Sequence, residues 1–483
     1  MQILEKKETG VIVDVKKDIV KIEGIPSCVY GEILEFASGD RGMIIEFDRQ
    51  HVTALALSGE KKLKPGDMVV SRGNIFTIKV TDKMIGRIVN SLGLPMDGKG
   101  AFDGGEKRLV FEDAVAILDR EPLHEALQTG IKTIDAMIPI GKGQRELIIG
   151  DRQTGKSTIA TDTIINQKGK GIICIYCWIG GGMMALHKLI EILAAGGALD
   201  YTIIVAAPAS VSAAEQYLAP YSAAAIGEYF MFKKRDVFTV FDNLTKHAWI
   251  YRQMSLLLGH SPGREAYPGD IFYIHSQLLE RAAKLKPEFG GSMTFFPIVD
   301  TLQGDVTGYV PSNLVSITDG QIYMSSTLFN QGFKPAIDIG LSVSRIGSKV
   351  QSPALKKVSG QLRLEYARYR ELQKLTKLRT KVSDEVAERI MAGEILTRLL
   401  MQPAACPVSD MQEILIFYAY GEKMLNKLTE QALANFQKSI LNFVKSKYPD
   451  FYQEFSEKKT LTPEVKDTLN KILADFFSIK KLI

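Results

Sequence analysis

The sequence predicts a multidomain protein with an N-terminal β-barrel at residues 1–72, a central α/β domain at 73–350 and a C-terminal α-helical bundle at 351–483. Three observations predict this order: short strand-like segments separated by turns, then apolar runs that alternate with helical patterns, then long charged helices. A chain of 483 residues is also too long for one hydrophobic core, so several domains are expected.

The barrel is predicted from alternation and turns in the first part of the chain. Val11, Val13 and Val15 alternate with other residues, and Ile19–Ile22 continues as a second strand-like segment. Proline, glycine and aspartate then mark tight turns, for example in Lys64–Asp67. Short strands joined by such turns are typical of a small closed barrel.

The central domain is predicted to contain a mostly parallel sheet covered by helices. Its clearest strand-like runs are Ile172–Ile179, Tyr201–Ala207 and Val237–Asp242, with helical patterns between them. Cys174 and Cys177 form a C-x-x-C pair, but both lie inside the first of these runs and the chain has no second pair. We therefore interpret them as core residues, with a metal or redox site as the alternative.

The C-terminal helices carry apolar stripes. Leu433, Phe436, Ile440, Phe443 and Val444 fall on one face of a predicted helix, with lysines elsewhere. This stripe is expected to face the core of the helical bundle, and the alternative is a groove for a partner.

Composition excludes some classes of function. A formal net charge of +5 over 483 residues gives no strong field, so neither nucleic acid nor an anionic membrane is expected as a partner. The first seven residues contain no apolar signal-peptide region, and no run approaches the roughly 18 apolar residues of a membrane span. Four scattered cysteines suit a reducing compartment.

The most informative motif is a phosphate-binding loop. It fits the pattern G-x-x-x-x-G-K-[ST] and consists of Gly150, Asp151, Arg152, Gln153, Thr154, Gly155, Lys156 and Ser157. A strand-like run precedes the loop and a helical pattern follows it, which is the context that the motif requires. Backbone N–H groups and the helix N-terminus attract a polyphosphate, Lys156 reaches its terminal phosphates, and Ser157 can bind magnesium.

Magnesium binding and hydrolysis require different residues. Asp242 closes an apolar strand and is predicted to hold magnesium through its water shell. Hydrolysis also needs a base, usually a glutamate, which in related hexameric motors follows the strand after the phosphate-loop helix. Here Gly180–Met184 occupies that place, and the next carboxylate is Glu191. The site is therefore predicted to bind a nucleotide without hydrolysing it.

Several segments resemble one known family. The loop sequence Gly-Asp-Arg-Gln-Thr-Gly-Lys is similar to that of alpha subunits of F-type ATP synthases, whereas catalytic beta subunits carry other residues between the two glycines. The similarity runs from about residue 8 to about residue 455 and includes the blocks Gly86–Gly100, Thr129–Lys132, Tyr251–Leu256, Pro262–Asp270 and Ser316–Ile322. The segment Pro335–Ser344, which Arg345 follows, resembles the signature shared by alpha and beta subunits.

This resemblance implies a fold and a site. The central domain would be a RecA-like P-loop nucleotide-binding domain that holds ATP or ADP with magnesium and does not hydrolyse it. Lys334, Pro335 and Gln402 would bind the nucleotide together with the phosphate loop. Arg345 would act in trans as an arginine finger in the catalytic site of a neighbouring beta subunit, and Ser316 would lie near that interface.

The resemblance also implies an assembly. Three alpha and three beta chains would form a ring around a gamma shaft, with delta and b stalk subunits as further partners, and would couple ATP synthesis or hydrolysis to proton or sodium transport. The chain would lie peripherally on the cytoplasmic side of a bacterial inner membrane and would meet the membrane only through the membrane sector. Its start lacks most of the leading helical segment through which alpha subunits usually contact the peripheral stalk, so a variant complex is expected.

Some residues depart from the usual pattern of alpha subunits. Gly181 and Ala404 stand where glutamines are usual, Lys334 stands where an arginine is usual, and Asn243 replaces a second aspartate after the magnesium aspartate. Because amide groups can hydrogen-bond a base or a phosphate, their loss predicts a modest selectivity for adenine.

Three other interpretations stay open. The chain could be an alpha-like subunit of a divergent F-type-like ATPase without a normal stator. It could be a self-sufficient hexameric ATPase or RNA translocase, which needs a catalytic glutamate and basic or aromatic patches in the barrel. It could also be a binding scaffold whose phosphate loop is vestigial.

Overall fold

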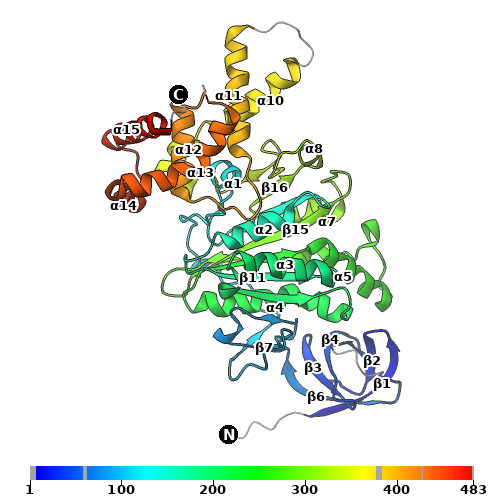
Figure 1. Ribbon diagram of the computed structural model, residues 1–483. Coiled ribbons are helices and arrows are strands. Elements are labelled where there is room, and N and C mark those ends of the chain that lie inside the picture. Colours follow the sequence, from blue (N-terminus) through cyan, green and yellow to red (C-terminus); the bar gives the residue numbers. More distant parts are fainter. Residues whose placement is uncertain (1–6, 58–62, 377–382, 427, 481–483) are drawn as a thin grey trace. The chain divides into compact units, whose positions relative to one another are not determined.

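The computed structural model describes residues 7–57, 63–376, 383–426 and 428–480. The first six residues, on which the expectations about the start of the chain rest, lie outside the described residues. Contacts between Cα atoms divide the chain into two compact units (Figure 1). Unit 1 consists of Met1–Pro122, Gly143–Leu147 and Lys168–Thr318, and unit 2 consists of Leu123–Lys142, Ile148–Gln167 and Asp319–Ile483. Within the described ranges, no helix is both long enough and apolar enough to cross a bilayer.

Unit 1 begins with a closed β-barrel, drawn in blue in Figure 1, whose strands follow the order β1-β2-β5-β4-β3-β6. The strands are β1 (Glu8–Lys16), β2 (Ile19–Glu23), β3 (Glu32–Phe36), β4 (Arg41–Phe47), β5 (Val52–Ala56) and β6 (Met68–Ile75). Buried aliphatic side chains and Phe36 form its core. The predicted N-terminal barrel is therefore confirmed.

Two of the three alternating valines that predicted β1, Val11 and Val13, face away from the barrel core, whereas Val15 packs against it. Val11 and Val13 are 43% and 37% exposed, whereas Ile12 between them is 1% exposed. Alternation reveals the period of a strand but not which of its two faces is buried. In this strand the interior is reached by Ile12, because the strand pairs on both sides within the closed barrel and only one face points inward.

A parallel sheet forms the centre of unit 1. Strands that neighbour each other in the order β15-β13-β11-β12-β8 are parallel, and β14 pairs with β15 in the antiparallel direction. These strands are β8 (Ile88–Val89), β11 (Ile173–Ile179), β12 (Thr202–Ala207), β13 (Val237–Asp242), β14 (Ala283–Lys284) and β15 (Ser292–Thr301). The three strands predicted from apolar runs are present, with bounds within one residue of the prediction.

Helices and a short ribbon complete unit 1. The helices are α3 (Met183–Ala195), α4 (Ala213–Phe232), α5 (Leu244–Leu258), α6 (Ile271–Leu279) and α7 (Tyr309–Ile317), and the ribbon consists of β7 (Thr77–Val80) and β9 (Glu106–Leu109). Helix α4 packs against β11, β12 and β13. The Ser212 hydroxyl accepts the backbone N–H of Glu215 at 3.1 Å, which stabilises the start of this buried helix.

The C-x-x-C pair lies in β11. Cys174 and Cys177 are both fully buried and form no disulfide. Residues three positions apart in a strand point to opposite faces of the sheet, so the two thiols do not converge on one point. Burial raises the pKa of both thiols, which keeps them protonated and unreactive. The structure therefore favours the interpretation as core residues.

Unit 2 combines the phosphate-loop helix with the C-terminal helices. Its strands follow the order β17-β16-β10 and are β10 (Leu147–Asp151), β16 (Gly320–Met324) and β17 (Val343–Ser344). Its helices are α1 (Lys132–Met137), α2 (Lys156–Ile165), α8 (Ser326–Asn330), α9 (Pro353–Ser359), α10 (Leu362–Thr376), α11 (Asp384–Leu400), α12 (Asp410–Gly421), α13 (Glu430–Lys447), α14 (Pro449–Lys458) and α15 (Pro463–Lys480).

The apolar stripe of α13 faces the helical core, as predicted. Leu433, Phe436, Ile440 and Val444 are buried, and Phe443 is half-buried. The rings of Phe436 and Phe443 both contact one ring of α15 edge-to-face, with centroid separations of 5.6 and 5.1 Å. The apolar side chains of this stripe therefore pack against other helices of the bundle.

A buried ion pair ties α4 to the segment after α6 in unit 1. The Arg281 guanidinium donates through Nε and Nη2 to the two carboxylate oxygens of Glu228 at 2.7 and 2.6 Å, and Nη1 donates to the Val110 carbonyl at 2.8 Å. The side chains of Arg281 and Glu228 are 1% and 4% exposed. The two charges therefore neutralise each other in a site that excludes water.

Replacing Glu228 with glutamine would leave the charge of Arg281 buried without its carboxylate. We expect Glu228→Gln to lower the free energy of unfolding of unit 1 by about 3–5 kcal/mol, measured by urea denaturation. The matched control is Glu35→Gln, because Glu35 pairs with Arg72 at 3.0 Å where both side chains are more than 40% exposed. The control substitution should lower the free energy of unfolding by less than about 1 kcal/mol. Equal losses in the two variants would contradict the assignment.

Candidate nucleotide-binding site

The phosphate loop connects β10 to α2 in unit 2. Gly155 precedes the first residue of α2, Lys156, and has a left-handed backbone with φ of 96°, which glycine adopts without strain. A Cβ atom at Gly150 would lie 2.8 Å from the Cβ atom of Met324 in β16, which is closer than non-bonded carbons approach. Both glycines of the motif are therefore required by local geometry.

Lys156 lies at the centre of this loop. It is 6% exposed, and its ammonium donates to the carbonyls of Gly150 and Asp151 at 2.9 and 2.5 Å. The Thr154 hydroxyl donates to the Asp151 carbonyl at 2.8 Å and closes the turn. Ser157 is exposed in the first turn of α2, where the helix dipole favours anions. These residues fit a magnesium-bound polyphosphate, because the loop brings together an ammonium, a hydroxyl and a helix N-terminus. A side chain added at Gly150 would clash with Met324.

The segment 402–407 is anchored within unit 2 by Gln402. This side chain is 8% exposed and donates its two amide hydrogens to the carbonyls of Gly130 and Cys406 at 2.7 and 2.9 Å. Its amide oxygen accepts the backbone N–H of Lys132 at 3.2 Å. Because both donors are used, Gln402 can offer a ligand only the remaining lone pair of its oxygen.

Helix α2 holds the same segment. The Asp162 carboxylate accepts the backbone N–H of Ala405 at 2.9 Å. Burial raises the pKa of Asp162 to about 6, because removal of water disfavours the charged carboxylate. At the other side of the segment, a Cβ atom at Gly130 would lie 2.7 Å from the Cβ atom of Pro407. No sequence motif singles out Asp162, so its role is not predicted from the sequence.

Lys334 also contacts this segment, and Pro335 follows it in the chain. The Lys334 carbonyl accepts the backbone N–H of Gln402 at 2.8 Å, and the Lys334 ammonium lies 5.2 Å from the ring centroid of Phe329. Unit 2 therefore brings together Lys334, Gln402 and α2, which the sequence places far apart. Their contacts with a nucleotide stay predictions.

The predicted magnesium residue lies in unit 1 at the end of β13. Asp242 is 7% exposed and accepts a hydrogen bond of 2.7 Å from the hydroxyl of Tyr176 in β11. The next residue, Asn243, accepts the backbone N–H of Lys246 at 2.9 Å and donates its amide to Asp300 at 3.1 Å. An aspartate at residue 243 could not donate to this carboxylate, which explains why asparagine suits this chain.

The two residues predicted to act in a neighbouring subunit are both exposed. In unit 1, the Ser316 hydroxyl donates to the carbonyl of Asn313 at 2.6 Å. In unit 2, the backbone N–H of Arg345 donates to the carbonyl of Asp319 at 2.9 Å. Among the described residues, the Arg345 guanidinium has no hydrogen-bond or ion-pair partner. Within the described ranges, Arg345 therefore forms no structural ion pair.

Comparison with known proteins agrees with this architecture. Models of the ATP synthase alpha/beta family match three successive segments: the beta-barrel domain at residues 6–73, the nucleotide-binding domain at 130–344 and the C-terminal domain at 351–476. The chain belongs to the ATP synthase alpha/beta family. The predicted order of barrel, nucleotide-binding α/β domain and helical domain is thereby confirmed.

Relatives within the ATP synthase alpha/beta family match nearly the whole chain. The protein named ATP synthase subunit alpha from Clostridium acetobutylicum is 46% identical over 477 residues, which cover 99% of this chain and 94% of that protein. The protein of the same name from Clostridium botulinum strain Hall is also 46% identical, with 99% and 95% covered. That from Petrotoga mobilis is 44% identical over 480 residues, with 98% and 95% covered. The resemblance to alpha subunits is therefore confirmed.

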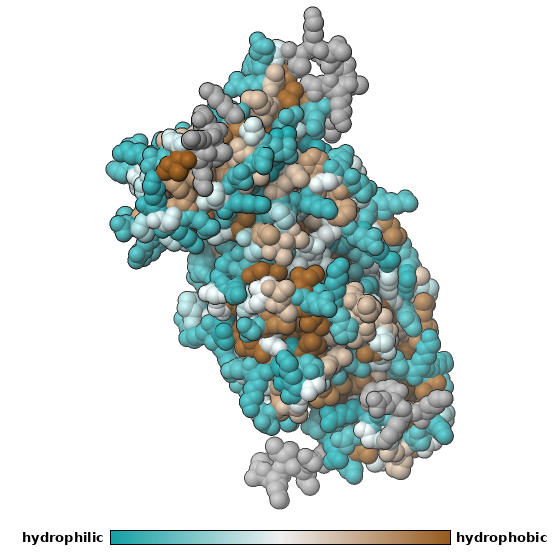
Figure 2. Space-filling view, in the orientation of Figure 1, coloured by the Kyte–Doolittle hydropathy of each residue, from teal (hydrophilic) through white to brown (hydrophobic). Residues whose placement is uncertain are grey.

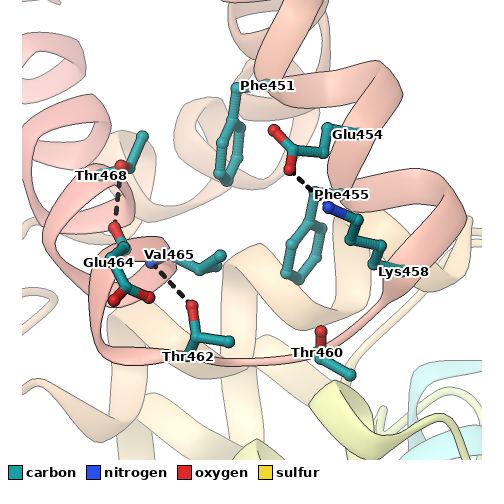
Figure 3. Close-up of a pocket in the computed structure, with 9 residues that line it drawn as sticks. All are labelled: Phe451, Glu454, Phe455, Lys458, Thr460, Thr462, Glu464, Val465 and Thr468. Atoms are coloured by element: carbon teal, nitrogen blue, oxygen red, sulfur yellow. Dashed lines mark hydrogen bonds and ion pairs between the residues drawn. The ribbon is translucent and has the colours of Figure 1, made fainter.

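A separate pocket lies between α14 and α15 in the C-terminal part of this family member. It has a volume of about 340 Å³, and Figure 3 shows its lining residues. Phe451 and Phe455 stack with a centroid separation of 5.6 Å, and Lys458 beside them donates to Glu454 at 2.8 Å. Lys458 and Glu454 are therefore paired with each other, and the pocket shares no residue with the phosphate loop or with the 402–407 segment.

The pKa of Asp162 predicts a specific dependence of stability on pH. Between about pH 4 and about pH 6 the folded chain keeps a proton that the unfolded chain has lost, so the free energy of unfolding falls as the pH rises. The total change is at most about 3 kcal/mol. Asp162→Asn keeps an acceptor for the Ala405 N–H and removes the titration, so this decline should disappear.

Melting temperatures of wild type and Asp162→Asn from pH 4 to pH 8 test this expectation. The control is Asp467→Asn, because Asp467 is exposed on α15 and its replacement should leave the profile of the wild type unchanged. An identical decline between pH 4 and pH 6 in wild type and Asp162→Asn would show that the buried carboxyl does not titrate as described.

Proposed function

We propose that this chain is the non-catalytic, nucleotide-binding alpha subunit of a rotary F-type ATP synthase. In that complex, three such chains alternate with three beta chains around a gamma shaft, delta and b subunits form the stalk, and ATP synthesis or hydrolysis is coupled to proton or sodium transport. The ring lies peripherally on the cytoplasmic side of a bacterial membrane. Family membership and relatives named ATP synthase subunit alpha support this proposal.

One observation carries the non-catalytic part of the proposal. The phosphate loop is complete, with Lys156 buried at its centre, while the segment Gly180–Met184 offers no carboxylate to activate a water molecule. Binding needs only the loop, whereas hydrolysis needs a base near the terminal phosphate. A chain that has a complete phosphate loop but no such base is expected to bind a nucleotide without hydrolysing it.

Each residue of the site then has a role. The backbone N–H groups of the loop and Lys156 hold the phosphates, and Lys334, Pro335 and Gln402 border the base. Ser157 would hold magnesium and Asp242 would hold it through water, while the Tyr176 hydroxyl orients the Asp242 carboxylate. Magnesium, when bound, neutralises charge on the phosphates.

Exposed apolar side chains support an assembly with partner subunits. In Figure 2, apolar side chains gather near the middle of the face shown. Ile117, Leu118, Met184 and Leu302 of unit 1 are each more than 75% exposed. Where exposed apolar side chains form one contiguous patch, they mark a surface that binds other proteins, and the proposed neighbours are beta chains.

We expect the full chain to bind ATP or ADP with magnesium and to release phosphate at a negligible rate. Lys156→Gln removes the ammonium that faces the phosphates and should weaken binding by at least about 100-fold, or about 2.7 kcal/mol. Titration with a fluorescent ATP analogue measures the affinity, and a phosphate-release assay measures turnover. Lys168→Gln, which removes an exposed lysine just after α2, is the matched control and should bind as the wild type does. Steady turnover by the wild-type chain alone would contradict the non-catalytic role.

Arg345 is expected to act in the catalytic site of the neighbouring beta chain. Assembled with wild-type beta chains, Arg345→Ala and Arg345→Lys should leave the ring intact and lower ATP hydrolysis by about 10³-fold, or about 4 kcal/mol of transition-state stabilisation. Lysine should restore little, because an ammonium does not reproduce the planar fork of a guanidinium. Hydrolysis is measured per complex after size-exclusion chromatography.

The control for Arg345 is Arg389→Ala, because Arg389 is an exposed arginine of α11 that pairs with Glu385 one turn earlier, at 2.7 Å. This variant should hydrolyse ATP at the rate of the wild-type complex. Weak assembly with normal turnover per intact ring in Arg345→Ala would instead assign Arg345 a structural role.

A further inference from the structure

We propose that His247 and His275 form an acid-sensitive joint in unit 1, which holds α4, α5 and α6 together while both imidazoles are neutral and releases α6 when the pair takes up protons. His247 lies in α5 and His275 lies in α6. The two residues are 0% and 1% exposed. The proposed nucleotide site uses neither of them, so the joint is a separate property of this chain.

One chain of hydrogen bonds joins the three helices. His247 Nδ1 lies 3.3 Å from His275 Nε2, and His247 Nε2 lies 3.0 Å from the backbone carbonyl of Tyr217 in α4. A carbonyl oxygen only accepts, so Nε2 of His247 carries the hydrogen and the neutral ring accepts at Nδ1. His275 must then donate from its own Nε2. The geometry therefore assigns one tautomer to each neutral imidazole.

Aromatic rings and α4 enclose the pair. The Tyr217 ring stacks on the His247 imidazole with a centroid separation of 5.4 Å, and the Tyr221 ring meets it edge-to-face at 6.0 Å. The Tyr221 hydroxyl donates to the carbonyl of Ile274 at 3.0 Å, which ties α6 to α4 next to His275. The imidazoles therefore lie in an interior that excludes water and favours their neutral forms.

The carboxylates of the surrounding helices have other neighbours. Asp270 accepts the Tyr251 hydroxyl at 2.5 Å, Glu228 binds Arg281, Glu280 accepts the Ser276 hydroxyl at 3.1 Å, and Glu215 faces the charge of Asp18 in the barrel. Neither imidazole bonds a carboxylate among the residues that the structure describes. Within those residues, a proton added to the pair therefore gains no hydrogen-bonded counter-charge.

The other titratable side chains near the pair are phenols and two cations of α5. Burial raises the pKa of each phenol, which keeps it neutral; these are Tyr30, Tyr217, Tyr221 and Tyr251. The cations Lys246 and Arg252 lie over the rings of Trp178 and Tyr267. Helix α7, which packs on α6, contributes Tyr309, whose ring also lies against Tyr267. No phenol changes charge in acid, so below neutral pH the titration of this region belongs to the two imidazoles.

Protonation conflicts with this arrangement. Burial lowers the pKa of His247 to about 4, although the hydrogen bond to the Tyr217 carbonyl opposes this effect. Burial and the neighbouring His247 lower the pKa of His275 well below its usual value. A second proton would also place two N–H groups against each other across the 3.3 Å contact.

The direction of the pH dependence follows from the released state. Once α6 is released, both imidazoles meet water and regain a pKa of about 6.5. The released form therefore binds more protons than the closed form below this pH. The stabilisation that the neutral pair provides is complete above about pH 6.5 and is lost as the pH falls toward about 4.

Hydrogen–deuterium exchange of the full-length chain, read by mass spectrometry, tests the joint. After correction for the intrinsic exchange rate, the protection factor of α6 peptides should fall about 20-fold between pH 7 and pH 5. This factor is expected for one imidazole whose pKa rises from about 4 to about 6.5 on release. Peptides of α3 should lose less than about threefold. A melting temperature would be less specific, because it would include the titration of Asp162 in unit 2.

His247→Gln combined with His275→Gln removes both titrations and keeps the hydrogen bonds, because an amide donates through its nitrogen and accepts through its oxygen. Its α6 peptides should change by less than about threefold between the two pH values. The matched control is His187→Gln, because His187 is exposed on α3, and it should keep the loss seen in wild type. Equal protection of α6 at pH 7 and pH 5 in wild type would overturn the inference, as would an undiminished loss in the double variant.

A second measurement needs only wild type and covers the case in which the double variant does not fold. Nuclear magnetic resonance of the chain with ¹⁵N-labelled histidine distinguishes neutral from charged imidazoles at its six histidines. At pH 5.5 the exposed His187 should be charged, whereas two imidazoles should stay neutral with their hydrogen on Nε2. Charge on all six imidazoles at this pH would overturn the joint.

Discussion

The candidate site depends on helix α2, which joins two loops into one rigid body. The helix begins at Lys156 inside the phosphate loop, and the Asp162 carboxylate on the same helix holds the backbone N–H of Ala405. Six residues of α-helix rise by about 9 Å, so the phosphate loop and the 402–407 segment keep a fixed separation. Gln402 then bonds the Gly130 carbonyl and completes the frame. A nucleotide that enters this frame meets a preformed site and loses little affinity to the ordering of loops.

Two arginines differ in their burial and in their hydrogen-bond partners, and therefore in their roles. Arg281 is buried and bonds both oxygens of Glu228 and a backbone carbonyl, so its donors are engaged in holding α4. Arg345 is exposed, and its guanidinium has no partner among the described residues. A guanidinium that serves its own fold is satisfied inside that fold, whereas one available to another chain is not. This difference supports the proposed role of Arg345 as an arginine finger.

The residues that depart from other alpha subunits are matched by their neighbours. Asn243 donates its amide to Asp300, which a second aspartate could not do. Gly181 accommodates the indole of Trp178, which a larger residue would displace. Nothing in the structure explains Ala404, which is exposed. Asn243 and Gly181 thus fit the packing and hydrogen bonding of this chain.

The sequence by itself determined the order of the three structural parts, the strands β11 to β13, the buried stripe of α13 and the phosphate loop. These features follow from patterns that are complete within short segments, such as the period of apolar residues or the spacing of glycines. Local patterns also predicted Asp242 at a strand end, because the end of an apolar run is visible in the sequence.

Only the tertiary structure decided which face of β1 is buried, what Gln402 bonds, and why residue 181 is glycine. Asp162 and Ala405 are 243 positions apart, so no local pattern links the carboxylate to the N–H group that it accepts. The exclusion at Gly181 depends on the direction of one buried ring, which the packing of the whole sheet determines. Such contacts are decided by how distant segments fill a common interior, and that information exists only once the chain is folded.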